Sequence, residues 1–310
     1  WWLLCHYEWY RYHGNKAYLE QSRDYITALL RQLMTQIAPD GQECLDGTRF
    51  LDWPSNSNKD AIAAGLQALM VWGMRVGVEF EDRQLSNDCK AAEKKLVKAA
   101  SKVYKKFLAS CPAPDAPGSK QVAALMTITG LIDAPKADKE FLSINGAQGF
   151  STFYGYYMLE AMATAGNYQG ALDVIREYWG AMIDLGATSF WEDFDINWIP
   201  NATPIDELVP EGKKDIHGDC GAYCYVGFRH SLCHGWASGP TSWLSRHILG
   251  VEVIEPGCRQ VRITPHLGDL QWVKGTFPTP YGEIQIYHEK QANGNVISEV
   301  KAPKGVSVIK

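Results

Sequence analysis

The chain has 310 residues, 46% of them hydrophobic, and a formal net charge of -5 at neutral pH. This length and apolar share suit one large domain with a substantial core and a second, small one. The negative charge argues against nucleic acid as a partner, and no apolar run predicts a membrane-spanning segment. Eleven Trp and fifteen Tyr are many for this length. Their flat rings suit the core and the faces of sugars equally well.

The eight cysteines are too sparse for a disulfide scaffold and lack paired CxxC spacing. Cys220, Cys224 and Cys233 lie near His217 and His234, but their spacing fits no standard zinc pattern. We therefore predict no metal and no cofactor. Because the chain opens on a helix-like pattern without an initiator Met, we expect the C-terminal portion of a longer protein, and a signal peptide could have preceded it.

The first 250 residues show the period of helices. Apolar side chains recur three and four positions apart in segments separated by Pro, Gly or Asn. These segments are 18–37, 57–76, 86–108, 153–165, 168–183 and 241–249, with another helix beginning at 119. Ser57 is expected to cap the second helix, and Gly186 to stop the clearest one. About eight helices with short connections favour an array of helical hairpins over a four-helix bundle.

Beyond Gly250 the apolar pattern changes to a period of two, which is typical of strands. Strands are predicted at 260–264, 270–277, 283–288, 296–300 and 306–309. Turns are expected at Tyr281-Gly282 and Asn293-Gly294. We therefore predict a helical domain over 1–250 and a small antiparallel β-sandwich over 251–310. The turn-rich connection 193–233 is long enough to indicate a functional loop.

One segment, Gly-Ala-Thr-Ser-Phe-Trp-Glu at 186–192, places the Glu192 carboxylate beside two rings just past a helix. Aromatic neighbours remove part of a carboxylate's hydration, and the negative helix end also disfavours its charge. Both effects favour a group that accepts a proton near neutrality. A solvated loop with three acids, Glu192, Asp193 and Asp195, is the plain alternative. A calcium site shared by the last two is a lesser one.

Two other clusters could contact a ligand. Asp52-Trp53-Pro54 precedes the second helix: Asp52 could accept hydrogen bonds from two vicinal hydroxyls while Trp53 stacks on the same sugar. A structural Asp-Trp-Pro turn is equally compatible. His234 lies in a Gly- and Ser-rich segment before the last helix, although a lone His is more often satisfied internally. No nucleophile elbow or Gly-rich phosphate loop is present in the sequence.

The segment 186–192 resembles the Gly-Ala-Thr-Thr-x-Trp-Glu signature of bacterial α-L-rhamnosidases, glycoside hydrolase family 78. The residues 234–240, the Pro256-Gly257 step and 275–282 are similar to the passage from that family's last barrel helix into its C-terminal β-domain. Asp52-Trp53 matches its Asp-Trp step. The resemblance implies an (α/α)6 toroid, incomplete here at about eight helices, that hydrolyses terminal α-L-rhamnosides with inversion.

The resemblance also implies roles for individual residues. Glu192 would be the general base that activates water. The residues expected to hold the sugar are Asp52, Trp53, His234, Trp2 and Trp191. The family's general acid lies in an Asp-x-x-x-Arg-Asp-Glu-Arg stretch that this chain lacks. We therefore expect the acid to come from an N-terminal barrel segment of the parent protein.

The partner implied is a carbohydrate with a terminal rhamnoside, and export to the periplasm or the medium is slightly favoured over the cytoplasm. Three alternatives stay open at this stage. One is another (α/α)6 glycosidase, such as an unsaturated glucuronyl hydrolase. Another is a carbohydrate-binding relative without catalysis. The third is a scaffold with no sugar site, in which Trp53 and His234 would face away from any common pocket.

Overall fold

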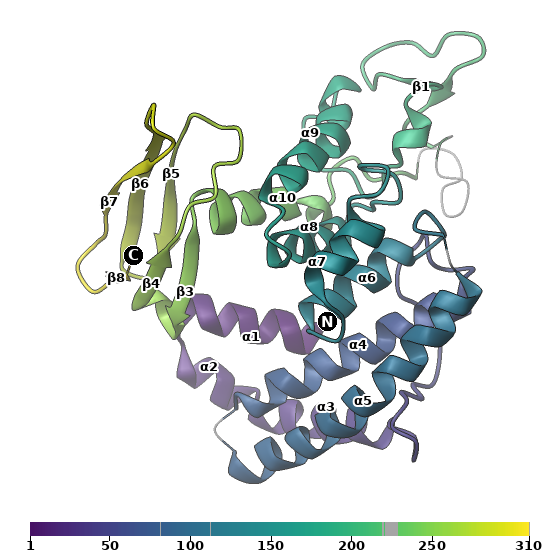
Figure 1. Ribbon diagram of the computed structural model, residues 1–310, viewed down its shortest axis with the longest axis vertical. Helices are drawn as coiled ribbons and strands as arrows, with labels where there is room; N and C mark the ends of the chain where they lie inside the picture. The colour runs from purple at the N-terminus through teal and green to yellow at the C-terminus, as the bar shows by residue number, and fades with distance from the viewer. Residues whose placement is uncertain (81, 112, 219, 221–228, 310) are drawn as a thin grey trace. The chain divides into compact units, whose positions relative to one another are not determined.

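The computed structural model describes residues 1–80, 82–111, 113–218, 220 and 229–309 (Figure 1). Contacts within the chain divide it into two compact units. Unit 1 comprises Trp1–Gly47, Gln67–Ser101 and Leu244–Lys310, and unit 2 comprises Thr48–Leu66 and Lys102–Trp243. Helices dominate up to residue 248, and strands dominate after it. The predicted class, mainly α with a small β-sandwich at the C-terminal end, is confirmed.

Unit 1 begins with three helices, α1 (Trp2–His13), α2 (Lys16–Gln21) and α3 (Arg23–Thr35). Asn15 caps α2 by accepting the Tyr18 amide at 3.2 Å. The segment predicted as one helix over 18–37 belongs to two, because the chain turns at Ser22, where α2 ends and α3 begins. Periodicity alone does not reveal this break, since apolar residues continue on both sides of it.

Two long helices, α4 (Lys59–Val78) and α5 (Arg83–Ser110), contribute to both units. Asn58, rather than the predicted Ser57, caps α4 by accepting the Ala61 amide at 3.0 Å. Among the described helices, α4 alone is long and apolar enough to cross a membrane, but 72% of its apolar window is buried inside the protein. Its buried Gln67 side chain donates to the carbonyls of Gly41 (3.0 Å) and Leu96 (2.8 Å). Both features are those of a core helix.

Unit 2 holds the remaining helices. They are α6 (Ser119–Ile128), α7 (Ala134–Ala137), which continues into a π-helical turn at 138–142, α8 (Gly155–Thr164), α9 (Tyr168–Asp184) and α10 (Gly239–Trp243). The buried helix α8 packs against α6, α9 and α10. The described residues thus form ten α-helices rather than about eight, because one predicted helix is split into α2 and α3 and the short helix α7 was not predicted.

The end of α9 occurs where the sequence predicts it. Gly186 has a φ of +89°, a conformation that glycine adopts without strain. Its amide donates to Ile183 at 2.9 Å, and the Ala187 amide donates to Met182 at 2.9 Å. This pair of bonds is the Schellman closure of a helix, and it redirects the chain toward Glu192.

Two small sheets complete unit 1. One contains β3 (Val251–Glu255), β4 (Gln260–Ile263) and β8 (Ser307–Ile309), and the other β5 (Trp272–Thr279), β6 (Gly282–Lys290) and β7 (Val296–Lys301). Their inward side chains share one core, formed by Val251, Val253, Val261, Ile263, Phe277, Ile284 and Ile286. The five predicted strands are confirmed, and β3 is an addition.

Three of the four strand pairings in the sandwich are antiparallel, and one is parallel. β8 pairs in parallel with β4, from Gln260 with Ser307 to Arg262 with Ile309. Parallel neighbours need a long connection rather than a hairpin. Here the chain runs through the whole second sheet before it returns to the first.

Candidate active site

Two chain segments of unit 2 run beside each other, the residues after α9 and the residues 230–236. The Glu192 amide donates to the Ser231 carbonyl at 2.8 Å, and the His234 amide donates to the Phe190 carbonyl at 2.7 Å. The Ser231 amide in turn donates to Oε2 of Glu192 at 3.2 Å. Glu192 is half-buried. Its main chain and one carboxylate oxygen are therefore fixed, while the side chain still reaches solvent.

The Glu192 carbonyl receives two further hydrogen bonds. The Thr152 hydroxyl donates to it at 2.5 Å and the Trp236 indole at 2.6 Å. The Trp236 ring is 37% exposed, and its centroid lies 4.4 Å from that of His234. A partly exposed indole next to an imidazole and to the main chain of Glu192 is a combination that suits a sugar ring with its hydroxyls. Trp236 lies in the segment 234–240 that carries the family resemblance, but nothing in the sequence distinguishes it as a site residue.

His230 contacts the peptide that follows Glu192, and the sequence did not reveal this contact. Its ring is buried, and Nδ1 lies 2.8 Å from the Ile216 carbonyl, so Nδ1 carries the proton. Nε2 therefore accepts the Asp193 amide, at 3.3 Å. The imidazole thus ties the peptide that follows Glu192 to the long connection. Phe194, the residue after Asp193, is held in a similar way: its carbonyl accepts the hydroxyl of Tyr178 from α9.

Asp52 lies inside the protein, with 4% of its surface exposed. Its Oδ2 accepts the Ser151 hydroxyl at 2.6 Å and the Gln121 amide at 3.0 Å, and Oδ1 accepts the Trp53 amide at 2.9 Å. Burial raises the pKa of Asp52 to about 6, against the effect of these hydrogen bonds, and the nearby Asp193 adds to the rise. Both oxygens face protein donors rather than the two sugar hydroxyls that we expected.

The Asp52 carboxyl makes a pH dependence of stability predictable. Its folded-state pKa of about 6 exceeds the ordinary 3.8, so the folded protein holds a proton that the unfolded chain releases. Stability should therefore fall as pH rises from about 4 to about 6, by up to about 3 kcal/mol from this group. Denaturant unfolding of the protein and of its Asp52→Asn form at several pH values measures this. If the difference in the free energy of unfolding between the two proteins stays constant from about pH 4 to about pH 6, the prediction is wrong.

Trp53 is half-buried and meets the Phe50 ring edge-on, with centroids 5.1 Å apart. Trp191, by contrast, has no exposed surface, and its ring packs edge-on to Phe194 at 6.0 Å and His230 at 6.1 Å. An enclosed ring offers no face to a sugar. In this structure Trp191 therefore supports the Glu192 segment from within, which differs from the sugar contact expected of it.

Trp2 belongs to unit 1, whereas Glu192, Asp52, Trp53 and His234 belong to unit 2. Its ring is 44% exposed and stacks on His6, with centroids 4.5 Å apart, and it meets Tyr25 edge-on at 4.7 Å. The exposed ring is available to a ligand or to another chain segment, and its predicted place in the sugar site stays a prediction.

The acids beside Glu192 have structural partners. Oδ1 of Asp195 accepts the Asn197 amide at 2.9 Å and caps the short 3-10 turn at 196–198. Oδ1 of Asp193 accepts the Phe194 amide at 2.9 Å. Within the described ranges, no group of three or more His, Cys, Asp or Glu is placed to hold a metal ion. Cys224, one of the three cysteines considered above for a zinc site, lies outside those ranges.

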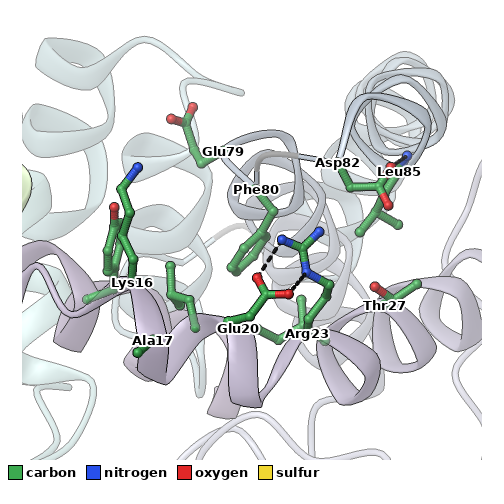
Figure 2. Close-up of a pocket in the computed structure, with 12 residues that line it drawn as sticks. Lys16, Ala17, Glu20, Arg23, Thr27, Glu79, Phe80, Asp82 and Leu85 are labelled. Atoms are coloured by element: carbon green, nitrogen blue, oxygen red, sulfur yellow. Dashed lines mark hydrogen bonds and ion pairs between the residues drawn. The ribbon is translucent and has the colours of Figure 1, made fainter.

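Unit 1 contains a pocket of about 360 Å³ between α2, α3 and the turn that leads into α5 (Figure 2). Ile26, Phe80 and Leu85 give it an apolar lining. Among its lining residues, Glu20 pairs with Arg23 through two bonds of 2.8 and 2.6 Å. None of the residues predicted for the sugar site lines this pocket.

Known proteins resemble this chain in sequence at one end and in fold throughout. Residues 250–309 match the sequence model of the bacterial α-L-rhamnosidase C-terminal domain. No curated protein matches the chain. In fold, the whole chain is similar to part of several solved glycoside hydrolases. More particularly, these solved structures are α-L-rhamnosidases.

A family 78 rhamnosidase of Bacillus sp. GL1 is similar over 99% of this chain and 32% of its own, with a TM-score of 0.68 and 21% identity. The α-L-rhamnosidase of Aspergillus terreus gives a TM-score of 0.67 and 16% identity over 99% of this chain and 35% of its own. The α-L-rhamnosidase of Streptomyces avermitilis, solved with L-rhamnose, gives a TM-score of 0.63 and 18% identity over 96% of this chain and 28% of its own. The chain thus spans about a third of the length of these relatives.

Proposed function

We propose that this chain is the C-terminal part of an inverting glycoside hydrolase that removes terminal α-L-rhamnose from glycans or glycosides. Residues 1–250 would belong to an (α/α)6 catalytic barrel and 251–310 to its β domain. The observation that carries the proposal is Glu192, in a signature-like segment: its carboxylate accepts the Ser231 amide, its carbonyl accepts the Trp236 indole, and the Trp236 ring lies next to that of His234. A relative of the same fold was solved with L-rhamnose.

Glu192 would act as the general base. In an inverting reaction one carboxylate takes a proton from the attacking water while a second, roughly 6.5–9.5 Å away, protonates the leaving oxygen. Among the described residues, Ser231 is the group that bonds to the Glu192 carboxylate, through Oε2. Oε1 is then available to orient a water molecule. One water is consumed, and rhamnose of inverted anomeric configuration and the free aglycone alcohol are released.

The second carboxyl group would come from the N-terminal barrel segment of the parent protein. Trp53 and His234 would contact the sugar, with Trp236 added to them on the basis of its exposed ring and its bond to the Glu192 carbonyl. Asp52, Trp2 and Trp191 were expected in the same subsite. The burial of Asp52 and Trp191 argues against a direct contact for these two.

The stereochemistry of the product tests the proposal. We expect the parent protein to hydrolyse an aryl α-L-rhamnoside and to release the β anomer of rhamnose first, followed by slow mutarotation, as observed by proton NMR. Release of the α anomer first would contradict inversion. Binding of rhamnose without any turnover would instead favour a carbohydrate-binding relative that has lost catalysis.

A further inference from the structure

Asp52 joins three parts of unit 2 at one buried point. The turn before α4 supplies the carboxylate, α6 supplies Gln121, and the residues before α8 supply Ser151. The Ser151 hydroxyl donates to a carboxylate, which makes a stronger bond than one to a neutral acceptor. The Ser151 carbonyl also accepts the Gly155 amide at 2.8 Å in the first turn of α8. Ser151 is thus fixed at both its side chain and its main chain.

The next residue, Thr152, makes the connection to Glu192. Its hydroxyl donates to the Glu192 carbonyl at 2.5 Å, and both Ser151 and Thr152 are buried. Adjacent side chains therefore bond to Asp52 on one side and to Glu192 on the other. A single dipeptide sets the distance between the buried carboxylate and the main chain of the proposed base.

We propose that Asp52, Ser151 and Thr152 form a positioning network for Glu192, in which Asp52 acts through the dipeptide rather than by touching the sugar. The inference rests on the proposed role of Glu192. It assigns a function to a buried carboxylate that the resemblance associates with substrate binding. It also explains why both carboxylate oxygens of Asp52 bond to protein donors.

The Glu192 carbonyl accepts two hydrogen bonds, and the network supplies the one from the buried Thr152 hydroxyl. The other donor, Trp236, lies on an exposed ring, whereas Thr152 is buried. A base that activates water must be held closely, because a displacement of about 1 Å at a catalytic group costs on the order of 100-fold in rate. Loss of the Thr152 bond alone, with the Trp236 bond kept, should therefore cost a smaller factor.

A matched pair of variants at Thr152 tests the network in the parent protein. Thr152→Val keeps the shape and removes the hydroxyl, whereas Thr152→Ser keeps the hydroxyl. We expect Thr152→Val to lower kcat by about 10-fold with KM nearly unchanged, and Thr152→Ser to retain the rate. Equal rates for the two variants, or a loss confined to KM, would overturn the proposal.

Ser151→Ala extends the test along the network. It removes the bond to Asp52, so we expect a similar loss in kcat. The double variant with Thr152→Val should lose no more than the larger single loss, because residues of one network are not additive. If the loss in kcat of the double variant equals the product of the two single losses, the two hydroxyls do not act as one unit and the proposal is wrong.

Hydrogen exchange separates this inference from the proposed function, because it needs no substrate and no turnover. In this chain, Thr152→Val should speed exchange of the Glu192 and Asp193 amides several-fold, and Thr152→Ser should not. A peptide from the middle of α9 serves as reference and should exchange equally in all three proteins. Equal exchange at Glu192 in both variants would overturn the network even if the enzyme is active.

Discussion

Replacing Glu192 with Gln in the parent enzyme should lower kcat for an aryl α-L-rhamnoside by about 10²- to 10⁴-fold, the range that a general base contributes. Gln keeps the size of the side chain, and its amide oxygen can still accept the Ser231 amide. The main-chain bonds to Ser231 and Trp236 do not involve the carboxylate. The segment should therefore stay in place while proton abstraction from water is lost, and KM should change little.

Steady-state kinetics measure this effect, and Glu207→Gln is the matched control. Glu207 is an exposed carboxylate in the same connection, so its replacement removes the same charge at a distance in sequence from the proposed base. We expect its kcat to stay within about twofold of the parent, because surface charges of this kind contribute little. A Glu192→Gln enzyme that keeps the parent rate would remove Glu192 as the base.

The features that sequence predicted well are those that local residues determine. The stripe at 168–183 became α9, since helical period and a terminal glycine at 186 both act within a few residues. The strands β5, β6 and β7 follow in the same way from alternation and from turns at Gly282 and Gly294. The split at Ser22 was missed, because the apolar pattern does not change there.

The features that sequence could not predict are pairings between distant segments. Ser231 is 39 positions from Glu192, and Ser151 is 99 positions from Asp52. A period or a cap signal carries no information about such contacts. The same limit applies to the tryptophans: the motif drew attention to Trp191, which is fully enclosed, whereas Trp236 is exposed beside Glu192. Tertiary packing alone decides which ring a ligand can reach.

Replacing Gly250 with Ala should destabilise the protein by about 2–5 kcal/mol. Gly250 has a φ of +76°, and a Cβ built there would lie 2.6 Å from the Pro265 nitrogen and overlap the Thr264 carbonyl. The conformation costs about 1–2 kcal/mol for a residue with a Cβ. The overlap adds about 1–3 kcal/mol, since main-chain atoms cannot turn aside as a flexible side chain would. Denaturant unfolding measures the loss.

Comparison with Gly294→Ala shows how much of the lost stability comes from the overlap of the new Cβ with Thr264 and Pro265. Gly294 also has a positive φ, +84°, and lies in the same β domain, but no atom lies within 4 Å of its Cβ position. Its replacement should therefore cost the conformational strain alone, about 1–2 kcal/mol. The Gly250 carbonyl accepts the Thr264 amide at 2.9 Å, next to the pairing of β3 with β4. Equal losses in the two variants would mean that the overlap with Thr264 and Pro265 adds no measurable cost, and would contradict the larger loss expected for Gly250→Ala.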